Sequence, residues 1–156
     1  MSRTKVAQSL QQMSVVLRFE IDKEKNTLNA FNIAQQYHQQ QKAKLASLQQ
    51  YRLEYMRQLQ QEGGKGVGAR HYQQKLSFVA KLDKACEQQN QIIAQASVVA
   101  SQRKRQWLTQ QRKRQAVEKL IDKKQGTLVQ LENRQEQQLN DEFALQRILR
   151  NQYLAG

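Results

Sequence analysis

A heptad repeat of apolar residues, in a chain of 156 residues without proline, most constrains what this sequence can fold into. Counted in sevens from Tyr72 to Leu149, nine of twelve positions are apolar or aromatic. The series is Tyr72, Val79, Cys86, Ile93, Ala100, Trp107, Arg114, Ile121, Leu128, Gln135, Glu142 and Leu149. Companion positions three residues later include Leu82, Ala96, Val117, Leu131 and Leu145. This spacing places a narrow apolar stripe on one side of a helix, which predicts a coiled coil without a concave pocket.

Low apolar content leaves disorder as an alternative. Hydrophobic residues make up 38% of the chain and the mean hydropathy is −0.88. Disordered chains usually contain proline and do not keep one heptad phase over so many repeats. The sequence therefore favours a helical coiled coil.

Four of the six glycines lie between residues 62 and 69, which form the one strong helix-breaking segment. We predict an all-α fold within a single domain, residues 1–156: a helix over about 3–61, a glycine-rich tip over 62–69 and a longer helix over about 70–155. A short connection makes the helices antiparallel, so the fold is a two-helix coiled-coil hairpin. Its pairing places Leu59 near Tyr72 and Lys5 near Thr127.

The predicted stripe is irregular at both ends of the chain. In the first helix an apolar shift of four residues through Ile21 to Leu28 predicts a stutter, a local unwinding of the supercoil. In the second helix the last 25 or so residues have no partner in the first helix, yet they stay apolar on one side. We expect a partner protein or a second copy to cover that side. Polar residues also interrupt the stripe at Gln89, Arg103, Gln110, Arg114, Lys124 and Gln138.

No pattern in the sequence indicates catalysis. The glycine segment formally matches a dinucleotide-binding pattern, but a long helix rather than a strand precedes it. His38 and His71 lack a second ligand at metal-binding spacing, and no nucleophile lies near a base. We therefore expect a protein that is not an enzyme and that uses no cofactor and no metal.

Two sets of surface residues could bind a partner. Near the tip, Leu48, Tyr51 and Tyr55 follow one another on the first helix, and Phe78, Leu82 and Ala85 do so on the second. Leu48, Tyr55 and Leu82 belong to the self-pairing stripe, whereas Tyr51, Phe78 and Ala85 flank it and should be partly exposed. Aromatic residues on a rigid helix are typical anchors for a protein partner. The alternative is that these residues only widen the contact between the two helices.

The second set is basic. The formal net charge is +13, and a basic belt comprises Arg103, Lys104, Arg105, Arg112, Lys113 and Arg114. Such a belt attracts anionic partners: nucleic acid, an acidic membrane face or an acidic protein surface. The N-terminal residues lack the apolar run of a signal peptide, and no run is long enough to span a membrane. These features predict a cytoplasmic protein.

From Leu45 to the C-terminus the chain resembles the flagellar export protein FliJ family, the coiled-coil component of the bacterial flagellar type III export apparatus. The residues that carry the resemblance are Tyr51-Arg52-Leu53-Glu54-Tyr55, Tyr72-Gln73-Gln74, Phe78, Leu82, Lys84-Ala85, Trp107 and Asp141-Glu142-Phe143-Ala144. Lys44 and Gln89 depart from the family pattern, which has glutamine and histidine there.

The resemblance implies a central-stalk-like component that promotes assembly and activity of the hexameric export ATPase. It also implies links to a membrane export gate protein and to export chaperones, a role in flagellum biogenesis and motility, and a location at the cytoplasmic face of the inner membrane without spanning it. The gate would bind Leu48, Tyr51, Tyr55, Phe78, Leu82 and Ala85. The ATPase ring would contact Leu10, Met13 and Leu17 near one end and Phe143, Leu145 and Leu149 near the other.

Two alternatives remain open at the level of sequence. A basic coiled coil could bind nucleic acid, although Trp107 is the only aromatic residue within the belt. A self-associating scaffold is the third possibility. The family resemblance favours the export role, with no nucleic acid expected as a partner.

Overall fold

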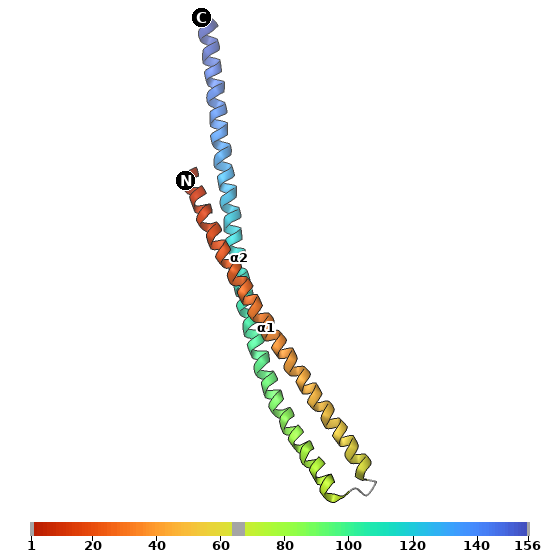
Figure 1. Cartoon of the computed structure of the whole chain (residues 1–156). Helices are drawn as coiled ribbons and strands as arrows, with labels where there is room; N and C mark the ends of the chain where they lie inside the picture. Colours follow the sequence, from red (N-terminus) through yellow and green to blue (C-terminus); the bar gives the residue numbers. More distant parts are fainter. Residues whose placement is uncertain (1, 64–67, 156) are drawn as a thin grey trace. The chain divides into compact units, whose positions relative to one another are not determined.

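A computed structural model describes residues 2–63 and 68–155 of the chain, and it contains two long helices, α1 (Arg3–Gly63) and α2 (Ala69–Ala155) (Figure 1). The predicted all-α fold with a longer second helix is confirmed. The predicted helix ends differ from the observed ones by at most two residues, and Gly126 lies inside α2 without ending it. The central part of the predicted tip, residues 64–67, lies outside the described residues.

Local hydrogen bonds explain where both helices begin. At the start of α1 the Ser2 hydroxyl accepts a hydrogen bond from the Lys5 amide at 3.3 Å, which satisfies one of the free donors of the first turn. At the start of α2 the Gly68 carbonyl accepts hydrogen bonds from the amides of His71 and Tyr72 at 3.1 and 3.2 Å.

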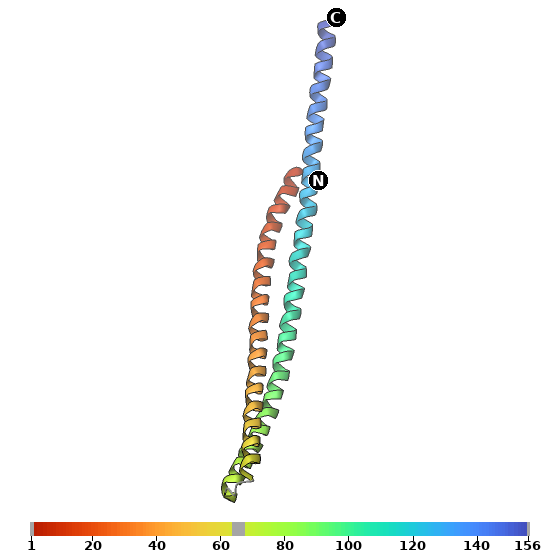
Figure 2. The ribbon, with the colours of Figure 1, turned by 90° about the vertical axis from the view of Figure 1, so that its right-hand side faces the viewer.

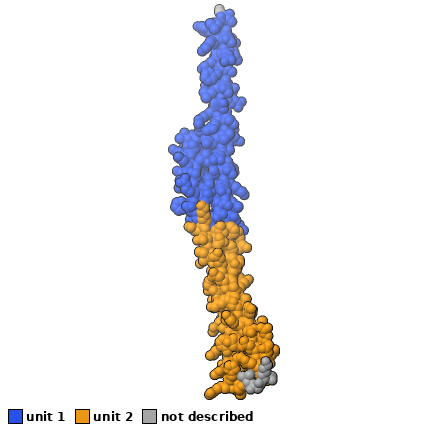
Figure 3. Space-filling view, turned by 45° about the vertical axis from the view of Figure 1, so that its right-hand side comes forward, with its two compact units in different colours: residues 1–24, 109–156 blue, residues 25–108 orange. Residues whose placement is uncertain are grey.

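The two helices form two compact units (Figure 3). Unit 1 comprises residues 1–24 and 109–156, and unit 2 comprises residues 25–108. Within each unit α1 and α2 run side by side in opposite directions, as the views in Figures 1 and 2 show. The assignment of the whole chain to a single domain stays a prediction.

The predicted stripe forms the contact between the helices. Its most buried apolar residues are small or aliphatic: Val6, Ala34, Leu59, Val79, Leu82, Ala96 and Ala100. Most of the remaining stripe residues as far as Leu131 are half-buried, whereas Arg103 and Tyr72 are exposed, with Tyr72 37% accessible near the beginning of α2. From residue 132 onward every described residue of α2 is exposed. Arg3 at the start of α1 still contacts Glu132 at 3.6 Å and donates to the Gln135 side chain at 3.4 Å.

The predicted stutter in α1 is not observed. Covered positions continue in strict steps of seven: Val6, Met13, Glu20, Thr27, Ala34, Gln41, Leu48, Tyr55 and Glu62 are all buried or half-buried. The apolar residues shift near Ile21, but the buried side of the helix does not. Polar side chains occupy the seam there because α2 supplies polar partners opposite them.

Candidate interaction surfaces

We call the line of contact between α1 and α2 the seam. At several positions along it, a polar residue of α2 pairs with a polar residue of α1. In unit 2 the Gln89 amide nitrogen donates to the Gln41 carbonyl at 2.9 Å and to the Gln41 side-chain oxygen at 2.7 Å. In unit 1 the Gln110 amide donates to the Glu20 carbonyl at 3.1 Å and also to its carboxylate. Among the residues that the structure describes, Gln89 and Gln110 are the most buried polar residues, at 3% and 7% exposure. Such specific pairs disfavour other registers of the two helices.

Arg114 is the charged member of this polar seam. Its guanidinium donates to the carboxylates of Glu24 and Glu118, with both Glu118 contacts at 2.9 Å. The hydrogen bonds to Glu24 and Glu118 raise the pKa of the Arg114 guanidinium above its usual value. Arg114 therefore serves the helix contact, unlike the other five residues of the basic belt, which are exposed.

The six residues predicted to bind the gate lie together in unit 2, and we call them the tip face. The rings of Tyr55 and Phe78 meet across the two helices, with centroids 4.7 Å apart and planes inclined by 43°. Leu82 is 7% exposed and belongs to the core, and Leu48 and Ala85 are half-buried. Tyr51 is 62% exposed and Phe78 is 42% exposed, so both present ring surface to solvent as predicted.

Ion pairs between the helices flank the tip face, and the sequence analysis missed them. Arg52 pairs with Asp83, and Lys75 pairs with Glu62. They could have been predicted from the sequence, because oppositely charged residues occupy positions that an antiparallel register brings together. These ion pairs help to hold α1 beside α2. The exposed rings of Tyr51 and Phe78 therefore lie on a surface that both helices form.

A polar hollow beside Tyr51 extends this surface, so the predicted absence of a concave pocket is wrong. It has a volume of about 330 Å³ and is lined by Ser47, Gln50, Tyr51 and Glu54. The Arg57 guanidinium donates a hydrogen bond to Glu54, and this contact lowers the pKa of the Glu54 carboxyl. Glu54 is therefore ionised at neutral pH, next to the exposed phenol ring.

The residues predicted to contact the ATPase ring fall into two different environments within unit 1. Leu10, Met13 and Leu17 are half-buried at the contact with α2. Phe143, Leu145 and Leu149 lie on the exposed segment 132–155, which we call the overhang, and are 68%, 57% and 55% exposed. Only the second group presents a free apolar surface.

Among residues 2–63 and 68–155, no cluster of His, Cys, Asp or Glu side chains is arranged to hold a metal ion. Within the same residues no helix combines the length and the apolar content needed to cross a bilayer. Cys86 is a half-buried free thiol in the seam.

Comparison with known families adds the deciding observation. The family model described as "Flagellar FliJ protein" matches residues 9–153, nearly the whole chain. The chain belongs to the flagellar FliJ family. The match includes α1 from residue 9 onward, whereas the resemblance in the sequence began at Leu45. Comparison with curated proteins and with solved structures gave no significant match.

Membership in the FliJ family makes the chain a component of the flagellar protein export apparatus, in a family that is not catalytic. Its association with the export machinery follows at that level.

Proposed function

We propose that this FliJ-family protein couples the hexameric export ATPase to the membrane export gate. The tip face binds the gate, and the overhang, with Leu10, Met13 and Leu17 nearby in unit 1, contacts the ATPase ring and promotes its assembly and activity. The protein also assists export chaperones and supports flagellum biogenesis and motility. It acts at the cytoplasmic face of the inner membrane without a membrane-spanning segment.

The observation that carries this proposal is that each of the two units has an exposed apolar surface of its own. Tyr51 and Phe78 are exposed in unit 2, and Phe143, Leu145 and Leu149 are exposed in unit 1. Exposed aromatic and aliphatic side chains on helices are typical anchors of protein interfaces. Two such surfaces on separate units allow two partners to bind one chain.

The structure offers a matched test of gate binding. We would replace Tyr51 and Phe78 by alanine in one variant, and Leu53 and Leu76 in the control. Leu53 and Leu76 are 66% and 44% exposed, and each is two residues from its counterpart, which turns it about 200° around its helix. Both variants remove similar exposed apolar surface, but from different sides.

We expect the Tyr51→Ala/Phe78→Ala variant to bind the cytoplasmic part of the gate at least about tenfold more weakly in calorimetry. The control should bind as the unchanged chain does, and both should keep the helical circular dichroism signal. Equal binding by both variants would remove the tip face from the proposal. Salt-sensitive binding of arbitrary DNA or RNA, unaffected by Tyr51→Ala/Phe78→Ala, would favour the nucleic-acid alternative.

A further inference from the structure

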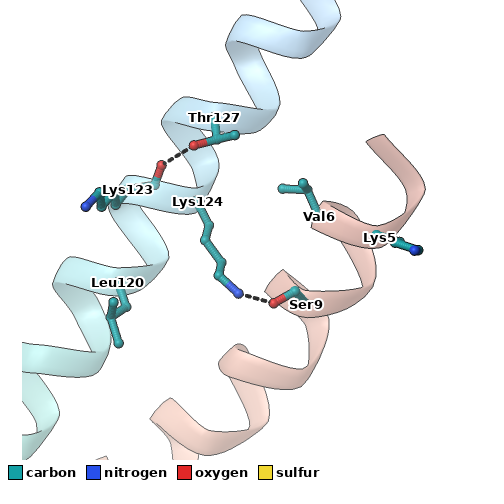
Figure 4. A pocket seen from close by; sticks show the side chains of 7 residues that line it. All are labelled: Lys5, Val6, Ser9, Leu120, Lys123, Lys124 and Thr127. Atoms are coloured by element: carbon teal, nitrogen blue, oxygen red, sulfur yellow. Dashed lines mark hydrogen bonds between the residues drawn. The ribbon is translucent and has the colours of Figure 1, made fainter. Parts of the chain in front are cut away.

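Unit 1 contains an apolar hollow between its two helices (Figure 4). It has a volume of about 310 Å³ and is lined by Lys5, Val6, Ser9, Leu120, Lys123, Lys124 and Thr127. Lys124 reaches across it and donates to the Ser9 hydroxyl, while Val6 points from α1 toward α2. Leu120 is 50% exposed, so the two helices leave part of this apolar wall uncovered.

Cations frame the hollow. Lys5 and Lys123 extend outward on its two sides in Figure 4. Among the described residues neither ammonium forms an ion pair. No carboxylate lines the hollow. A partner helix would therefore bind over the hollow most favourably if its apolar residues faced Leu120 and its carboxylates faced the lysines.

The same face continues along unit 1. Val16, which is 47% exposed, lies seven residues after Ser9 on α1, and Lys113, also exposed, lies seven residues before Leu120 on α2. Residues seven apart share one side of a coiled-coil helix. The hollow is thus part of a longer surface that combines apolar and basic residues.

One side of the overhang has the complementary composition. Residues three, four or seven apart share a side of a helix, which places Asp141, Glu142, Leu145, Ile148 and Leu149 together. Its three apolar residues are 54–57% exposed. The whole overhang contains four carboxylates and three arginines. The overhang contains 24 described residues, and α1 contributes 22 helical residues to unit 1, so the overhang is long enough to cover the face.

We infer that the hollow of unit 1 binds the overhang of a second copy of this chain, in an antiparallel dimer. Each copy covers the hollow of the other, so the contact is symmetric and closed. Placing the half-exposed Leu145 on the half-exposed Leu120 sets the register. In an antiparallel pair, the residue three positions before Leu145 lies opposite the residue three positions after Leu120. This register places Glu142 of one copy opposite Lys123 of the other.

This dimer goes beyond the proposed function and does not rest on it. The dimer covers the overhang surface that the ATPase ring would use, so the two contacts exclude each other. Self-association would then keep the apolar overhang covered when no ring is present.

Sedimentation velocity on the full chain tests the inference with charge reversals. We expect a monomer–dimer equilibrium. Lys123→Glu alone and Glu142→Lys alone should each weaken dimerisation at least about tenfold, because each places like charges opposite one another twice in the symmetric dimer. An equimolar mixture of the two variants restores opposite charges at both contacts and should restore dimerisation. Lys104→Glu and Glu87→Lys are matched controls at exposed sites in unit 2 and should dimerise normally.

A monomer at all concentrations would overturn the inference. A dimer that neither reversal weakens would also overturn it, because the contact would then lie elsewhere. Failure of the mixture to recover would refute the antiparallel pairing of Glu142 with Lys123. Helical circular dichroism confirms that each variant is folded, and gate binding by the same variants is independent of these outcomes because the tip face lies in unit 2.

Discussion

The indole ring of Trp107 stacks on the phenyl ring of Phe31 between the helices of unit 2, with centroids 6.0 Å apart and planes inclined by 6°. Both rings are half-buried. We predict that Phe31→Ala lowers the free energy of unfolding by about 2 kcal/mol, through lost burial and lost ring contact. Chemical denaturation followed by the fluorescence of Trp107, the one tryptophan of the chain, measures this change.

Phe19→Ala is the matched control for that experiment, because Phe19 is 66% exposed. Its free energy of unfolding should stay within about 0.5 kcal/mol of the unchanged chain. Equal effects of the two substitutions would mean that the Phe31–Trp107 contact does not stabilise the helix pair.

The contacts of Arg114 with Glu24 and Glu118 predict that removing one charged residue destabilises the fold more than removing it together with its partner. Arg114→Leu alone should lower the denaturation midpoint, because it leaves the half-buried Glu24 carboxylate without this guanidinium. Replacing Arg114 and Glu24 together by leucine should recover stability, since two apolar residues then meet in the seam. A double-mutant cycle in urea measures the coupling, and additive effects would contradict it.

Gly126 offers a stabilising substitution. It lies inside α2, and a Cβ atom added there would meet no atom within 4 Å. Gly126→Ala should therefore stabilise the helix by about 1 kcal/mol. Thermal unfolding measures the gain, and a lower midpoint would indicate that some contact requires the glycine.

The lowered pKa of Glu54 predicts a pH dependence. Because the carboxyl is more acidic when folded beside Arg57, this contact stabilises the folded chain above the ordinary glutamate pKa of 4.5, and the contribution is lost as the pH falls through the lower folded value. An NMR titration of the Glu54 side chain should give a midpoint below 4.5. In Arg57→Gln the midpoint should return toward the ordinary value. The same midpoint in both chains would contradict this contact.

The two helices and their pairing could be predicted from sequence because one physical signal specifies both. Apolar residues in sevens define a buried side, and the glycine segment fixes where the chain reverses, which placed Lys5 near Thr127 as observed in the lining of the hollow. Exposure of Tyr51 and Phe78 followed from their positions beside that stripe.

The polar pairs of the seam were harder to predict, because a heptad pattern is recognised from apolar residues alone. The shift at Ile21 suggested a stutter, whereas Glu20 and Glu24 continue the buried side by bonding Gln110 and Arg114. Polar side chains that face one another across the hairpin identify these buried positions. They can be paired only once the register of the two helices is known. The roles of the tip face and the overhang stay predictions because exposure alone does not identify a partner.

The central claim is that one chain joins the export ATPase to the export gate, and co-sedimentation of the three purified proteins tests it most directly. The cytoplasmic part of the gate should sediment with the ATPase only when this chain is added. The Tyr51→Ala/Phe78→Ala variant should retain the ATPase and lose the gate. A gate that sediments with the ATPase equally well without the chain, or a chain that binds neither protein, would contradict the account.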